Sequence, residues 1–187
     1  MIYASGFGKL IDGEEGLQVV IAHSQTKYPE WQERGDSASA PVATHEKIPA
    51  DATEEKNGRY RLPNGNYLDN TASHFVLTLG DNPQTALISM KSTQLKISRK
   101  WNSMMAGIKM KGKNGLFTPA SFSHEYRLRT VQQSNDKGTW FGWEVQKIGP
   151  VSNTELYQQA KVFAESISKG NVKAKHGETN KKDSSHF

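Results

Sequence analysis

The 187-residue sequence has no cysteine and no long apolar run. Without cysteine the chain can form neither a disulfide framework nor a thiolate zinc site, and it has no cysteine nucleophile. Its longest strongly apolar run is Val19–Ala22, whereas a membrane span needs about 20 such residues and a secretory core about 7 to 15. We therefore expect no membrane span and no ordinary secretion, and a reducing compartment fits the composition.

Acidic residues are scarce in the middle of the chain. Residues 91–129 hold nine Lys or Arg against the single acid Glu125, net +8, although the whole chain carries only +5 and residues 1–60 carry −4. A field of one sign attracts polyanions and speeds their arrival. The nine cations are Lys91, Lys96, Arg99, Lys100, Lys109, Lys111, Lys113, Arg127 and Arg129.

Length and composition predict one domain with extensions, because domains average about 150 residues. Hydrophobic residues make up 35% of the chain, enough for one core. Residues 34–58 hold hardly any large apolar side chain, and we expect a mobile insertion there. The polar, charged residues 171–187 predict a disordered C-terminal tail, which leaves a single domain over residues 1–170.

The order of hydrophobic patterns indicates a mainly-β α+β protein. Strands are expected over 18–23, in hairpins near 59–68 and 74–89, and over 122–131 and 140–148. An apolar stripe with helical spacing predicts a helix from about residue 93 to 107–112, and the Ser152-x-x-Glu155 capping box and Gly170 bound a second helix after Pro150. This order predicts an OB-fold-like five-stranded barrel with one helix between strands three and four and a C-terminal helix. Two other small α+β architectures fit the same order.

Aromatic side chains accompany the basic region, and a flat ring can stack on any base of a single strand. Tyr126, Trp140 and Trp143 are the candidates for this role, whereas Trp101 lies on the apolar stripe and is expected in the core. A turn centred on Asp136 would place Arg129 opposite Trp143. A slip of one residue would bury the tryptophan instead, so the register stays open.

Catalytic patterns are weak. The six histidines show no metal-ligand spacing, and the acids of 12–15 and 51–55 fall in expected loops, where two carboxylates are hard to fix for acid–base work. Gly6-Phe7-Gly8-Lys9 does not complete a phosphate loop. We expect no enzyme, no cofactor and no metal site.

Four stretches carry a family resemblance: Ala86–Asn102, Gly142–Val145, Gly149–Val151 and Leu156–Lys161. Together they resemble a group of small proteins of tailed bacteriophages that is similar to phage single-stranded DNA-binding proteins. The resemblance implies an OB-fold and a place in the cytoplasm of the bacterial host. In such binders an acidic tail ending in an aromatic residue recruits replication proteins. Phe187 matches that ending, but Lys181 and Lys182 depart from the acidic pattern.

The sequence thus predicts a non-catalytic single-stranded DNA-binding protein of phage DNA replication or recombination. The nine cations would hold phosphates, and Tyr126, Trp140 and Trp143 would stack on bases. Phage replication proteins are expected partners through the tail, and self-association into a homo-oligomer stays open. The alternative is a phage protein-interaction or virion component whose positive region binds an acidic partner.

Overall fold

The computed structural model describes residues 2–4, 9–33, 40–56, 59–80, 82–136 and 138–172, and for 2–4 and 9–11 it describes the backbone alone. The chain divides into two compact units. The first comprises residues 1–25 and 72–172, and the second comprises residues 26–71 and 173–187. Residues 173–187 of the predicted tail lie outside the described residues.

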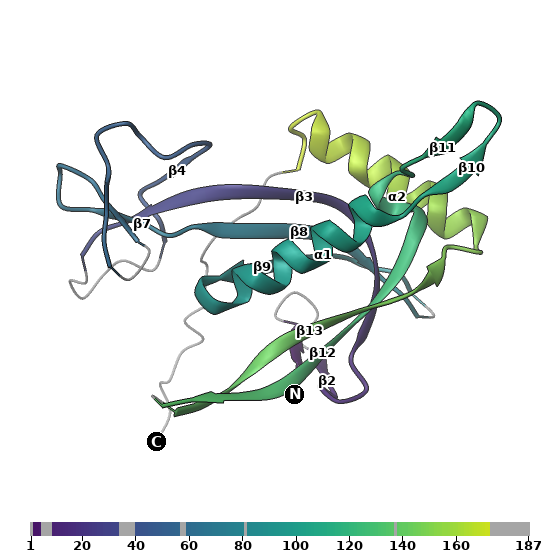
Figure 1. Ribbon diagram of the computed structural model, residues 1–187, viewed down its shortest axis with the longest axis horizontal. Helices are drawn as coiled ribbons and strands as arrows, with labels where there is room; N and C mark the ends of the chain where they lie inside the picture. The colour runs from purple at the N-terminus through teal and green to yellow at the C-terminus, as the bar shows by residue number, and fades with distance from the viewer. Residues whose placement is uncertain are drawn as a thin grey trace, which may run out of the picture. The chain divides into compact units, whose positions relative to one another are not determined.

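A curled antiparallel sheet forms the body of the first unit (Figure 1). Its strands are β3 (Leu17–Trp31), β8 (Thr71–Thr78), β9 (Thr85–Lys91), β12 (His124–Asn135) and β13 (Gly138–Pro150), in the spatial order β9-β8-β3-β12-β13. Apart from it, β1 (Ile2–Ala4) pairs with β2 (Lys9–Ile11) in a two-stranded sheet. The sequence-based prediction of a mainly-β α+β protein is confirmed.

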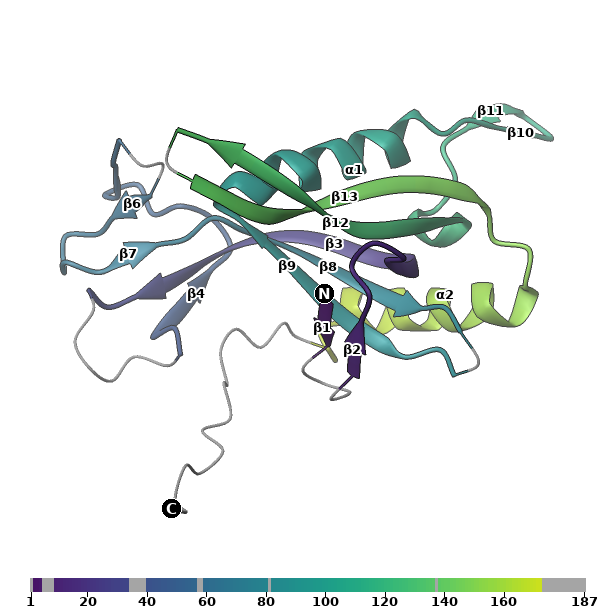
Figure 2. The ribbon, with the colours of Figure 1, turned by 90° about the horizontal axis from the view of Figure 1, so that it is seen from below.

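Two helices lie on opposite sides of this sheet, as Figure 2 shows. The 3-10 turn η1 (Ser92–Gln94) leads into α1 (Leu95–Gly107), which matches the predicted stripe, and α2 (Thr154–Ser168) follows the last strand as expected. Between α1 and β12 the chain forms a hairpin of β10 (Met110–Gly112) and β11 (Gly115–Phe117), then the short turn η2 (Ser121–Ser123). None of the described helices is long and apolar enough to cross a membrane.

Trp101 of α1 fills the centre of the larger core. Its side chain is completely buried among apolar residues of all five strands. It contacts the ring of His74 on β8, with centroids 4.8 Å apart, and the edge of Tyr126 on β12 at 5.5 Å. The prediction that Trp101 belongs to the core is confirmed.

His74 connects three elements of the first unit although it is completely buried. Its Nδ1 lies 2.9 Å from Ser24 Oγ on β3, and its Nε2 lies 2.9 Å from Ser98 Oγ on α1. A hydroxyl can donate or accept, so both ring nitrogens of a neutral imidazole are satisfied. Burial lowers the pKa of His74 to about 4.

The second unit contains the last residues of β3 with the short strands β4 (Ala43–His45), β5 (Thr53–Glu54), β6 (Tyr60–Arg61) and β7 (Tyr67–Leu68). The β6–β7 pair is the predicted hairpin, with Gly65 at a positive φ of 87° in its turn. The insertion expected over 34–58 contains strands β4 and β5 where it is described. Residues 34–39, 57 and 58 lie outside the described residues.

A buried carboxylate organises this second unit. Glu30 is only 6% exposed. Its Oε2 lies 2.6 Å from His45 Nε2, and its Oε1 accepts hydrogen bonds from the side-chain amides of Asn66 at 2.6 Å and Asn64 at 3.0 Å. These hydrogen bonds, that from Asn66 first, lower the pKa of Glu30. In the described part of residues 34–58, His45 is therefore held by a polar contact that composition does not reveal.

The N-terminal cap of α2 differs from the predicted one. Asn153, not Ser152, is the cap residue, and its Oδ1 accepts a hydrogen bond from the backbone of Leu156 at 3.1 Å. We expect Asn153→Ala to lower the free energy of unfolding by about 1 kcal/mol, because the part-buried backbone N–H of Leu156 loses its hydrogen-bond acceptor. Ser152→Ala is the matched control and should change it by only a few tenths. Urea denaturation of both variants makes the comparison, and equal losses would contradict the assignment.

Burial of His74 gives the stability a defined pH dependence. Because its pKa is about 4 in the folded protein and about 6.5 in an unfolded chain, the unfolded state binds more protons between these values. Stability is therefore complete above pH 6.5 and falls as the pH drops toward 4, by on the order of 3 kcal/mol from this group. His74→Gln, compared with wild type by urea denaturation at pH 7 and 5, should show a shallower decline. A pKa near 6.5 in an NMR titration of His74 would contradict the expectation.

Candidate nucleic-acid interface

Helix α1 presents three predicted cations on its outer side. Lys96, Arg99 and Lys100 are exposed: Arg99 lies opposite the stripe that carries Trp101 into the core, and Lys96 and Lys100 flank it. Arg99 Nε donates to the Leu95 carbonyl at 3.3 Å. Among the described residues none of the three cations forms an ion pair, so their charges are free to meet an anion.

The hairpin that follows α1 carries three more predicted cations. Lys109, Lys111 and Lys113 are all exposed, and Lys109 Nζ donates to Thr118 Oγ1 at 2.5 Å. Lys113 and Asn114 form the two-residue turn of a paired hairpin, and Gly115 begins β11 at a φ of 110°. Asn-Gly pairs are a strong short-range signal for hairpins, and the Asn114-Gly115 pair stands next to this turn in the sequence, although the two turn residues are Lys113 and Asn114. In both ribbon views the β10–β11 hairpin extends beyond the end of α1 (Figures 1 and 2).

We call these six exposed cations on α1 and the hairpin the basic strip. The chain contains no Asp or Glu from residue 91 to residue 124, so no carboxylate of this segment neutralises the strip. Lys91 ends β9 just before α1 and is half-buried. The members of the strip are Lys96, Arg99, Lys100, Lys109, Lys111 and Lys113.

Arg127 and Arg129 do not join the basic strip. They alternate along β12 with Tyr126 and Leu128, which point into the core, so they leave the strand on its other face. The guanidinium of Arg129 donates to Glu144 Oε2 on β13 at 2.5 Å, and the two side chains form an ion pair between neighbouring strands. Arg127 and Arg129 therefore lie apart from the basic strip, and their predicted role in holding phosphates stays a prediction.

Tyr126 is completely buried and its ring packs against Trp101. Burial raises the pKa of its phenol to about 12. No base can reach this ring without opening the core, so its predicted stacking role is corrected. The physical reason is the alternation of β12, which sends Tyr126 and Leu128 to the same apolar side.

Trp140 and Trp143 are half-buried, and their register differs from the predicted one. Asn135 pairs with Gly138, so Trp143 lies opposite Thr130 and Arg129 lies opposite Glu144. The error is one residue, because the turn between the two strands holds two residues and is not centred on Asp136. Trp143 packs against the larger core, and its backbone N–H donates to Gln94 Oε1 at 3.0 Å. The observed register is therefore shifted by one residue from the expected one, in the direction that pairs Trp143 with Thr130 and leaves its side chain half-buried.

Among the residues that the structure describes, the most exposed aromatic rings are two phenylalanines that the sequence analysis did not select. Phe141 on β13 is 69% exposed and Phe117 on β11 is 48% exposed. Phe117 belongs to the hairpin that carries half of the basic strip. Its spacing matches no helical stripe, so only recognition of the hairpin turn at Lys113 and Asn114 could have placed it on a strand.

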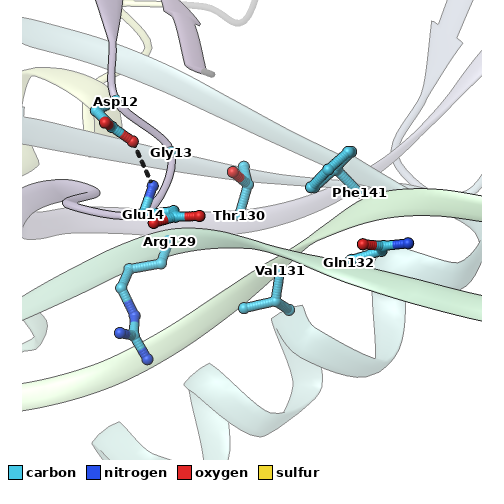
Figure 3. Close-up of a pocket in the computed structure, with 8 residues that line it drawn as sticks. All are labelled: Asp12, Gly13, Glu14, Arg129, Thr130, Val131, Gln132 and Phe141. Carbon is cyan, nitrogen blue, oxygen red and sulfur yellow. Dashed lines mark hydrogen bonds between the residues drawn. The ribbon is translucent and has the colours of Figure 1, made fainter.

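Phe141 lines an open depression of about 760 Å³ in the first unit (Figure 3). The turn that borders this depression carries Asp12 and Glu14, and Asp12 Oδ1 accepts a hydrogen bond from the Glu14 backbone at 2.8 Å. Figure 3 shows the side chains of Phe141 and Arg129 leaving the strands in opposite directions. Two exposed carboxylates and Arg129, whose guanidinium is paired with Glu144, line the depression, so we do not include it in the candidate interface.

Metal and acid–base arrangements are weak in the described part of the chain. Its histidines and acids include no group of three or more that could hold a metal ion. In the second unit, Glu30 lies beside a cavity of about 350 Å³, but both of its oxygens already accept hydrogen bonds. Its carboxylate is a structural acceptor and not a free base.

Comparison with known proteins gives one match. No curated protein matches the chain, and no solved structure does. The family model described as Pam3 phage gp34-like protein matches residues 1–173, which include both helices and every strand described above. This confirms the expectation of a bacteriophage protein, and the chain belongs to the Pam3 phage gp34-like protein family.

Proposed function

We propose that this phage protein binds single-stranded DNA without catalysis, in replication or recombination of the phage genome. One observation carries the proposal: six exposed cations follow one another along α1 and the adjoining hairpin, in a segment of 34 residues that contains no acid. A groove or strip of one sign that follows a sugar-phosphate backbone is the electrostatic part of single-strand recognition.

The strand order supports the same proposal. Strands β3, β8 and β9 follow one another in the sheet, and the next long strand, β12, returns to lie beside β3. The spatial order fourth-first-second-third is that of a Greek key. An OB-fold is a partly open Greek-key barrel of five strands that commonly binds oligonucleotides. We therefore propose that the first unit is a variant OB-fold, in which α1 lies between the third and fourth of these strands as the sequence predicts.

The alternative function is binding of an acidic protein partner, such as another phage or virion component. The basic strip would attract both kinds of ligand, but a nucleic acid also offers flat bases. The β10–β11 hairpin that carries half of the basic strip also exposes Met110, Leu116 and Phe117, and these apolar side chains favour the nucleic acid.

Salt dependence tests the proposal. If about four phosphates are neutralised, the logarithm of the association constant should fall with the logarithm of salt concentration at a slope near −3, at roughly 0.7 per contact. The measurement is fluorescence anisotropy of a labelled oligo-dT at four or more salt concentrations. Lys96→Gln with Lys100→Gln should reduce the slope by about 1.4, because two phosphate contacts are lost.

The matched control is Lys161→Gln with Lys169→Gln. These two lysines are also exposed, at α2 on the other side of the sheet, and their loss should leave the slope unchanged. A slope near zero, or equal effects of the two double variants, would contradict the proposal. Equal affinity for poly-glutamate and for oligo-dT would instead support the acidic-partner function.

A further inference from the structure

The β10–β11 hairpin exposes an unusual amount of apolar surface. Leu116 is 74% exposed, Phe117 is 48% exposed and Met110 is 39% exposed. In the described residues this hairpin pairs only with itself, as a separate two-stranded sheet. An isolated hairpin is marginally stable in water at best, and these side chains add nothing to either core cluster. Their exposure therefore calls for a ligand.

Gly112 holds the ring of Phe117 in a defined place. A Cβ added at Gly112 would lie 3.1 Å from both Cδ1 and Cε1 of that ring, so the ring lies against the glycine backbone. The φ of Gly112 is not in the left-handed region, and its conformation does not itself require glycine. The missing side chain instead makes room for one side of the ring, and the other side remains open to solvent.

Cations flank this open ring along the hairpin. Phe117 shares its face of the hairpin with Met110 and Gly112, whereas Lys111 and its partner Leu116 lie on the other face. Lys113 is at the tip and Lys109 is at the base of the hairpin. A flat apolar surface among exposed ammonium groups complements a single strand, because the bases are flat and apolar-faced and each is attached to a phosphate.

We propose that Phe117 stacks on an unpaired base of single-stranded DNA and that the β10–β11 hairpin is the base-contacting element of the basic strip. Gly112 acts as a positioning residue for the ring. The inference rests on the proposed function, which supplies the strand, and adds to it the group that distinguishes bases from bare phosphates. A protein partner fits less well, because lysines interrupt the apolar side chains along β10 and at the tip, and no acid of the segment balances their charge.

The experiment compares two ligands of equal length and charge: labelled oligo-dT and the same backbone with abasic tetrahydrofuran sites. Phe117→Ala should weaken oligo-dT binding by roughly 5- to 150-fold, the ratio that ~1–3 kcal/mol of stacking per base gives. It should leave both the abasic affinity and the salt slope unchanged. Phe117→Trp should retain oligo-dT binding, and its added indole fluorescence should be quenched by dT.

Phe141→Ala is the matched control, because Phe141 is an exposed ring on a strand of the same unit but lies beside Asp12 and Glu14. It should bind both ligands as the wild type does. Gly112→Ala should weaken oligo-dT binding in the same direction as Phe117→Ala, since the added methyl group displaces the ring. Equal unfolding midpoints establish that the variants fold, as expected for residues outside both core clusters.

The outcomes separate the two proposals. If the wild type binds neither ligand, the proposed function is wrong. If it binds both with the expected salt slope but Phe117→Ala behaves as wild type, only the present inference is overturned. Equal losses on oligo-dT and on the abasic ligand would also overturn it, because the contact would then not involve a base. So would conversion of a dimer to a monomer by Phe117→Ala in sedimentation equilibrium, which would identify the hairpin as a contact between copies of the chain.

Discussion

The burial of Trp101 against the curled sheet is the contact on which the first unit depends. It attaches α1 to β8 and β12 through the rings of His74 and Tyr126, and it decides which side of the helix faces outward. Because the indole takes the inner side, Lys96, Arg99 and Lys100 have only solvent to face. The position of the basic strip is thus a consequence of core packing and needs no ion pair to maintain it.

Sequence periodicity predicted the elements that follow from hydrophobic burial alone. The stripe through Trp101 gave α1 almost to its ends, and the alternation around Leu128 gave β12. The same reasoning could not fix the register of β12 and β13. A shift of the turn by one residue leaves the hydrophobic pattern of each strand unchanged and alters only which residues face each other. That single residue decides that Arg129 meets Glu144 and that Trp143 meets Thr130.

Polar organisation was the part that the sequence concealed. Residues 34–58 are poor in apolar side chains, yet His45 of this segment binds the side chain of Glu30. The same carboxylate also accepts hydrogen bonds from Asn64 and Asn66, which lie more than 30 residues further along the chain. Nothing local marks these four as partners, because each is an ordinary polar residue in its own stretch. The candidate site shows the same limit: its cations were visible as a charge run, whereas the exposure of Phe117 depends on a hairpin that packs against no core.

The hydrogen bond from the Trp143 backbone to the Gln94 side chain bears on the association of protein molecules through their sheet edges. Strand β13 lies at the margin of the curled sheet in the part of the chain that the structure describes, and the unpaired amides of such a margin can recruit a strand from a neighbouring molecule. The Gln94 side chain occupies one of these amides and, with Gln133, leaves no room for a side chain at Gly142. At this one position, the glutamine at the start of the helix thus occupies an edge amide that a strand of a neighbouring molecule would need.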